Sequence, residues 1–114
     1  MHDEVARRML GLLGLGVRGG GAVVGVEQVR DAARRGKLTL AVVAPDASRH
    51  SIAKVKPLLE AKRVRIIEGP TATQLGAAVG RESTAAVGVL DRNLARGILA
   101  IVDGAQTSPT GGSV

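Results

Sequence analysis

The amino-acid sequence predicts an α/β domain with a small, mostly buried sheet between two layers of helices. Apolar residues recur with helical and then strand periodicity in turn, and this alternation of elements is typical of α/β domains. The segment 39–44 is apolar at nearly every position, as in a strand whose two faces are both covered. A chain of 114 residues is long enough for one such domain.

Residues 3–16 predict an amphipathic helix, and a short strand is expected at 22–24. The apolar positions of the helix are Val5, Met9, Leu12 and Leu13. Glycines at 14, 16 and 19 have the G-x-G-x-x-G spacing of dinucleotide-binding loops, so a nucleotide-dependent enzyme is one alternative. That loop requires a strand before it and a helix after it, whereas the predicted order here is the reverse. We therefore expect the glycines to form a turn.

A second helix is expected between Gly25 and Gly36, because glycine commonly ends helices. Its buried side consists of Val26, Val29 and Ala33. The apolar strand at 39–44 follows almost directly. Helices must lie on both sides of this strand to cover its two faces.

A third helix is expected to reach about Lys62 from an N-cap at Asp46 or Ser48. Pro57 lies in the middle of this helix and should kink or break it, because proline has no backbone N–H to donate. The segment 63–69 then predicts another strand.

The last part of the chain predicts a short helix, a strand and a final helix. Thr71 and Gln74 have the capping-box spacing for a helix that runs to Gly80. A strand is expected at 84–90, and Asp91 should cap the final helix. The apolar members of that helix are Leu94, Ile98, Leu99 and Ile101. We expect 1–103 to be the domain and 104–114, which is small and polar, to be a disordered tail.

The composition favours a polyanionic partner. Sixteen Lys and Arg residues against ten Asp and Glu give a net charge of +6, and most of the cations are arginine, which suits phosphate geometry. Phe, Tyr and Trp are absent, and this argues against proteins that stack single-stranded bases on aromatic rings. The net charge is also compatible with a basic surface that has no polyanionic partner.

Several chemistries are not expected. Without cysteine the chain has no disulfide, thiolate zinc site or cysteine nucleophile. His2 and His50 stand apart from any catalytic pattern, so we expect no catalytic residue, metal or cofactor. No signal peptide or membrane-spanning stretch is apparent, which predicts a cytoplasmic location and no membrane partner.

Three segments are distinctive in their order and spacing. They are VGVEQVRDAARRGKLTLAVVAPDAS, LLEAKRVRIIEG and QLGAAVGRESTAAVGV. Over about residues 5–100 the chain resembles the superfamily of ribosomal proteins L-seven-Ae and L-thirty-e, and its small bacterial YlxQ-type members in particular. The resemblance implies a three-layer α/β/α sandwich with a small mixed sheet. It also implies binding to structured RNA, typically the kink-turn, in which a bulge bends the duplex sharply.

The resemblance places an RNA site at the start of the second helix and in the loop before the last strand. The family's glycine falls on Gly25, its Asn-Glu pair on Glu27 and Gln28, and its lysine on Asp31. Only the glycine matches, and Asp31 would present a repelling charge to RNA. Bacterial members tend to have a further lysine where this chain has Gly21.

Basic residues nearby are expected to compensate by forming a rim around the helix start. They are Arg18, Arg30, Arg34, Arg35 and Lys37. The loop at 80–84 adds Arg81, Glu82, Ser83 and Thr84, the last two of which could hold an unstacked nucleotide. Alternatively, the charges of the second helix form a solvated, balanced surface.

With the nucleotide enzyme disfavoured, two functions of different classes remain. The first is non-catalytic binding of a kink-turn-like RNA, ribosomal or other, by a monomer associated with ribosomal or translation proteins. The second is a protein-interaction scaffold of the same fold, in which the changes at Gly21, Glu27 and Asp31 have abolished RNA affinity. Salt-sensitive binding to RNA distinguishes the two.

Overall fold

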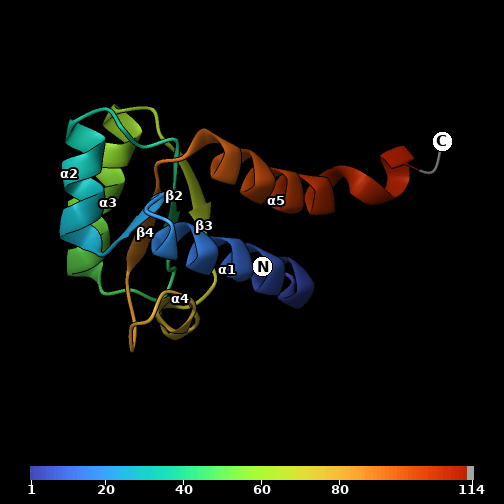
Figure 1. Cartoon of the computed structure of the whole chain (residues 1–114), viewed down its shortest axis with the longest axis horizontal. Coiled ribbons are helices and arrows are strands. Elements are labelled where there is room, and N and C mark those ends of the chain that lie inside the picture. The colour runs from blue at the N-terminus through green and yellow to red at the C-terminus, as the bar shows by residue number, and fades with distance from the viewer. Residues whose placement is uncertain (113–114) are drawn as a thin grey trace.

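Helices and strands alternate along the whole of the described chain (Figure 1). This computed structural model describes the backbone of residues 1–112 and the side chains of residues 1–104. The elements are α1 (Asp3–Arg18), β1 (Ala22–Val24), α2 (Val26–Arg34), β2 (Leu40–Val43), α3 (Arg49–Ala61), β3 (Arg65–Glu68), α4 (Ala72–Ala78), β4 (Ala86–Val89) and α5 (Arg92–Gly112). Within these residues no helix has the length and hydropathy needed to cross a bilayer.

The four strands form one mixed sheet in the order β1-β4-β2-β3. Strand β4 runs antiparallel to both β1 and β2, whereas β2 and β3 are parallel. In this register Val42 of β2 lies between Val87 and Ile67. The central strands β2 and β4 are buried at every position, as the apolar segment 39–44 predicted.

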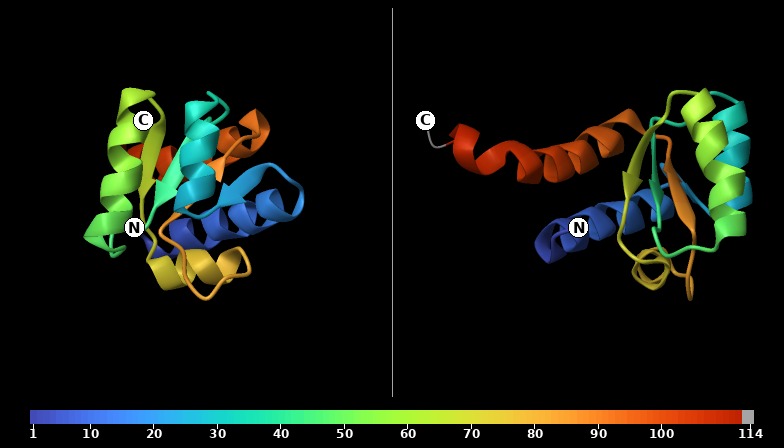
Figure 2. Two further views of the ribbon diagram at one scale, coloured as in Figure 1. Left: turned by 90° about the vertical axis from the view of Figure 1, so that its left-hand side faces the viewer. Right: turned by 180° about the vertical axis from the view of Figure 1, so that it is seen from behind.

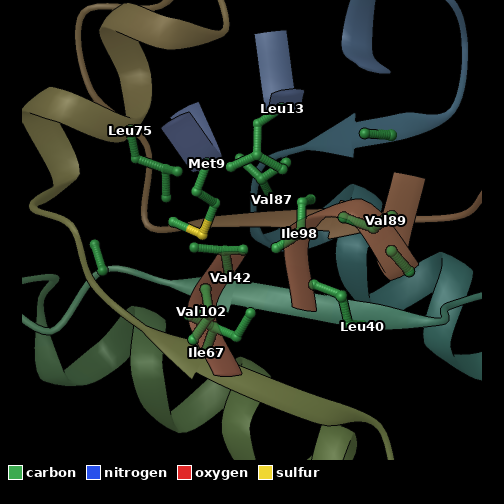
Figure 3. Packing of buried hydrophobic residues seen from close by; sticks show 13 residues of the cluster. Met9, Leu13, Leu40, Val42, Ile67, Leu75, Val87, Val89, Ile98 and Val102 are labelled. Carbon is green, nitrogen blue, oxygen red and sulfur yellow. The ribbon is translucent and has the colours of Figure 1, made fainter. Parts of the chain in front are cut away.

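Helices cover both faces of the sheet, so the fold is a three-layer α/β/α sandwich (Figure 2). Leu40, Val42 and Ala44 pack with α1, α4 and α5, where the larger core lies (Figure 3). Ala41 and Val43 point to the other face and pack against α2 and α3. This alternation along a single strand explains why its sequence is continuously apolar.

The glycine pattern at 14, 16 and 19 belongs to a helix and its end. Gly14 and Gly16 lie inside α1, and a Cβ atom added at Gly14 would stand 2.6 Å from the carbonyl oxygen of Ala78. Gly14 therefore lets α1 approach α4 closely. Residues 19–21 make the turn before β1, with Gly20 at φ +82°. The expectation that all the glycines form a turn was wrong for the first two.

The buried side of α1 also differs from the one expected. It consists of Ala6, Met9, Leu13 and Gly14, whereas Val5 and Leu12 are only half-buried. The small residues face the neighbouring helices because they allow close packing, and the larger Val5 and Leu12 flank the contact.

Helix α3 has Ser48 as its N-cap, whose hydroxyl accepts a hydrogen bond from the Ser51 N–H at 3.1 Å. Asp46, the other candidate, instead accepts from the Ala72 N–H at 2.8 Å and so joins this loop to α4. Pro57 does not break the helix, which continues to Ala61. Proline removes only one helical hydrogen bond, and burial of Val55 and Leu59 on either side holds the helix together.

The remaining helix ends agree with the sequence. Thr71 and Gln74 form a complete capping box, and the Asp91 carboxylate accepts from the Asn93 N–H at 3.2 Å. Gly36 follows the end of α2 with φ +68°. The backbone of α5 continues past Gly104, where the sequence placed the start of a disordered tail. The side chains of 105–112, and residues 113–114 altogether, lie outside the described residues, so the tail stays a prediction.

Candidate nucleic-acid interface

The fold joins the two segments that the sequence assigned to an RNA site. The Gly25 N–H, at the start of α2, donates to the Ala86 carbonyl oxygen at 2.9 Å. The Thr84 hydroxyl donates to the same oxygen at 3.2 Å. The start of α2 and the loop before β4, some sixty residues apart in sequence, therefore meet where β1 pairs with β4.

Gly25 gives this end of α2 an open geometry. Its φ of +98° lies in the region that favours glycine, and a Cβ atom there would meet no other atom within 4 Å in the described part of the chain. No side chain caps the helix at this end. The N–H groups of the first turn, which carry partial positive charge, are therefore left for an external acceptor.

Helix α4 holds the loop at 80–84 in place. The Arg81 N–H donates to the Gly76 carbonyl at 2.8 Å, and the Thr84 N–H donates to the Ala72 carbonyl at 3.0 Å. A Cβ atom added at Gly76 would stand 2.7 Å from the Ser83 nitrogen, so the loop backbone lies directly against the helix. Arg81, Glu82 and Ser83 are exposed, whereas Thr84 is buried. Thr84 thus supports the loop from within.

The acidic residues of α2 have cationic neighbours. Glu27 lies 3.6 Å from Arg30 Nη1 through one carboxylate oxygen and 3.7 Å from Lys54 Nζ through the other. Asp31 pairs with Arg35 at 3.2 Å, four residues further along the helix. Such exposed pairs contribute little stability, so their cations can turn toward a phosphate at small cost. Gln28 is exposed beside them.

The expected basic rim is not assembled around the helix start. Arg30 lies one turn into the helix, is 26% exposed, and has a buried Nε without a hydrogen-bond partner among the described residues. Arg34 and Arg35 lie at the opposite end of the nine-residue helix, about 12 Å away at 1.5 Å per residue, and Lys37 lies beyond them. Arg18 lies elsewhere again. Its Nη1 would lie 3.8 Å from a Cβ atom added at Gly14. The same added atom would contact the Ala78 carbonyl oxygen at the end of α4, so Arg18 lies near that helix end.

Sequence reasoning missed two contributors to this region. Lys54, on α3, reaches Glu27 only because α2 and α3 pack side by side on the sheet. Gly76 lies beneath the loop backbone, and a glycine inside the short helix of the LGAAVG segment could have indicated this close contact. Nothing in the sequence indicates that Lys54 and Glu27 lie close together, because they are far apart along the chain.

Metal-binding groups do not gather in the described residues. No three His, Cys, Asp or Glu side chains of residues 1–104 lie close enough to hold a metal ion. His50 is exposed on α3, and His2 Nδ1 accepts the Glu4 N–H at 3.2 Å as the cap of α1. What this interface offers is hydrogen-bond donors, an uncapped helix end and cations.

Known proteins share this architecture. Residues 7–97 match the sequence model of the ribosomal protein L7Ae/L30e/S12e/Gadd45 family. A protein of unknown function from Bacillus halodurans superposes with a TM-score of 0.76 at 29% identity, covering 84% of this chain and 97% of that one. The Giardia lamblia 15.5kD RNA binding protein has a TM-score of 0.76 at 21% identity, covering 93% and 91%. No significant match was found among curated proteins.

Proposed function

Because the chain belongs to the ribosomal protein L7Ae/L30e/S12e/Gadd45 family, we propose that it binds structured RNA of the kink-turn type and catalyses no reaction on it. The observation that carries this proposal is the shared acceptor at Ala86, which joins the start of α2 to the loop at 80–84. These are the two segments that a kink-turn would contact together. The same fold occurs in the Giardia lamblia protein, which is named as an RNA binding protein.

The proposed contacts follow from the chemistry of each segment. The uncapped first turn of α2 offers N–H donors to a phosphate or a base edge. The exposed Gln28 amide can both donate to and accept from a base edge. Ser83 and the loop backbone hold the unstacked nucleotide, while Thr84 keeps the loop against α2. Shape-selective contacts of this kind need no aromatic side chain.

The cations near Glu27 and Asp31 supply the phosphate contacts. Arg30 and Lys54 both lie beside Glu27, and both exchange its carboxylate for a phosphate when RNA is present. Arg34, Arg35 and Lys37 extend the contact along the stem, about one helix length further on. Arg18 and Arg81 contact the RNA from the α4 side of the loop.

The biological setting is also part of the proposal. We propose a monomer of the YlxQ type that acts in the cytoplasm with ribosomal RNA or another kink-turn RNA, in association with translation. The net charge of +6 supports a polyanionic partner, because it accelerates encounter with RNA and keeps like molecules apart.

A comparison of two RNAs tests the proposal. A kink-turn RNA and a straight duplex of equal length and composition are titrated with the protein at two salt concentrations. We expect the kink-turn to bind more tightly at both, with affinity for each RNA falling as salt rises. Equal affinity for the two RNAs would contradict recognition of the kink.

One observation favours the interaction scaffold as a second function. Glu27 lies near two cations and Asp31 pairs with a third, so the carboxylates of α2 offset much of the positive charge on this surface without RNA. A scaffold of this kind would bind neither RNA at low salt. That result would replace the RNA-binding proposal by this one.

A further inference from the structure

A groove runs between α1 and α5, in the helical layer on the other side of the sheet from α2. Its volume is about 870 Å³, and its lining includes Val5, Arg8, Leu12, Leu15, Gly97 and Ile101. The two helices lie side by side along much of α1 (Figure 1). The groove shares no residue with the proposed RNA interface.

The groove exposes apolar surface that the described chain does not cover. Leu15 is 59% exposed. Among the described residues, Met1 is the one other large hydrophobic residue that is exposed. Val5, Leu12 and Ile101 are half-buried around it. From Val5 to Leu15 the apolar surface extends over about 15 Å of helix, or three turns.

Gly11 keeps the groove open at a cost to α1. Glycine destabilises a helix interior relative to alanine, and Gly11 has no positive φ that would require it. A Cβ atom at this position would meet nothing within 4 Å in the described residues. Packing among the described residues therefore does not explain the glycine, whereas a partner that approaches the backbone closely would.

The charges at the groove select the partner's chemistry. Arg7 and Arg8 line it and no acidic residue does, while Arg96 is exposed one turn before the lining residue Ala100. Arg7 pairs with Glu4, whereas Arg8 and Arg96 have no ion pair in the part of the chain that is described. A symmetric second copy would bring the same arginines together, and each copy carries a net charge of +6. An acidic partner meets no such repulsion.

We propose that the α1–α5 groove binds an amphipathic helix of a partner protein that carries acidic residues beside its apolar face. The apolar face covers Leu12 and Leu15 over Gly11, with anchors at i, i+3, i+4 and i+7. The flanking carboxylates meet Arg8 and Arg96. This site acts independently of the RNA interface and links an RNA-bound molecule to a second protein.

A stapled helical peptide is the probe for this site. It has leucines at the four anchor positions and glutamates on their flanks, carries a fluorophore, and is titrated by fluorescence polarisation. A second peptide keeps the leucines and replaces every glutamate by lysine. We expect micromolar binding of the acidic peptide and at least about tenfold weaker binding of the basic one.

Two protein variants locate the binding. Gly11→Leu places its Cβ atom in open space and its side chain in the groove, and it should weaken the acidic peptide at least about tenfold, while the melting temperature of the variant does not fall. Ala53→Leu, on the exposed surface of α3, adds the same side chain elsewhere and should leave the peptide's affinity unchanged. Kink-turn RNA should bind Gly11→Leu as it binds the unaltered protein.

Three outcomes would overturn the proposal. They are no binding of the acidic peptide, equal binding of both peptides, and unchanged binding to a folded Gly11→Leu variant. If the unaltered protein binds the acidic peptide as expected but does not bind kink-turn RNA, only the RNA function is rejected. The two proposals can therefore fail separately.

Discussion

Asp31 is the residue at which this chain departs most sharply from the site that the family resemblance implies. Its carboxylate pairs with Arg35 at 3.2 Å, so the departure removes one cation and engages a second. Glu27 behaves similarly toward Arg30 and Lys54. At the scale of single residues, RNA affinity is therefore set by a competition between carboxylates and phosphates for the same cations.

We predict that Asp31→Lys tightens binding to a kink-turn RNA several-fold. The substitution removes a negative charge from a phosphate-facing surface, adds a positive one and releases Arg35. Each charge–phosphate interaction at about 5 Å is of order 3 kcal/mol at an effective dielectric constant of roughly 20, and screening leaves about 1 kcal/mol. Glu60→Lys, near the end of α3, makes the same charge change away from the interface. An equal gain from both variants would show that net charge alone is responsible.

Gly76 is a second residue whose replacement should have a sharp effect. A Cβ atom there would stand 2.7 Å from the Ser83 nitrogen and 2.8 Å from its carbonyl carbon, and backbone atoms cannot turn aside as a side chain can. Gly76→Ala should lower the free energy of unfolding by about 1–3 kcal/mol and weaken RNA binding by displacing the loop. Gly11→Ala, where the space is open, should raise it by about 0.5–1 kcal/mol. Urea denaturation measures both, and a neutral Gly76→Ala would refute the role given to this contact.

At the scale of elements, the local structure could be predicted well because its signals are local. Each signal lies within a few residues of the structure that it determines. Examples are the Thr71–Gln74 capping box, the helix end at Gly36 and the apolar strand at 39–44. The end of α3 near Lys62 was predicted, whereas the break expected at Pro57 does not occur because tertiary packing outweighs the local defect.

The length of α2 decides which cations can act together. Lys54 lies beside Glu27 in the first turn and Arg30 lies one turn further on, whereas Arg34 and Arg35 lie about 12 Å from the helix start. The sequence predicts that the arginines of α2 form one basic group around the helix start. It fails to separate them because residue types alone give no distances along an element. Lys54 was missed for the complementary reason, since only the packing of α3 on α2 brings it near Glu27.

We predict that Lys54→Gln makes the salt dependence of RNA binding shallower. Losing one phosphate contact should reduce the slope of log affinity against log salt by about 0.9 on a duplex stem. Affinity for different RNA sequences should fall about equally, because a phosphate contact carries no sequence information. Lys62→Gln, at the far end of α3, is the matched control and should leave the slope unchanged. A changed sequence preference with an unchanged slope would mean that Lys54 contacts a base.

The ion pair between β3 and α5 gives a pH dependence to the stability of this side of the sheet. Arg65 donates hydrogen bonds to Asp103 at 2.7 and 3.2 Å, and these hold the pKa of the Asp103 carboxyl below its ordinary value. A lowered pKa in the folded state adds stability above the unfolded value of about 3.9, and that stability is lost as pH falls through the folded pKa. Asp103→Asn should therefore lower the melting temperature at pH 6 and have less effect at pH 2. An equal effect at both pH values would contradict a role for the charge.

At the scale of the whole molecule, the sheet separates two surfaces with different chemistry. The sequence predicted the α/β/α layers because β2 is apolar on both faces, and the packing of alternate residues confirms it. Through the family resemblance it also predicted an RNA site in two segments, and the fold brings these two segments together. It could not predict the hydrogen bonds at Ala86 that join them, since strand pairing between β1 and β4 is a tertiary event. The residues that contact RNA stay a prediction.

The most direct measurement of the central claim is an NMR titration of the isotope-labelled protein with a kink-turn RNA. If the start of α2 and the loop before β4 form one interface, the amides of 25–31 and 80–84 should shift together along one binding curve. The amides that line the α1–α5 groove should stay in place. Shifts confined to other surfaces, or two segments that titrate with different affinities, would contradict a single RNA interface at this end of the sheet.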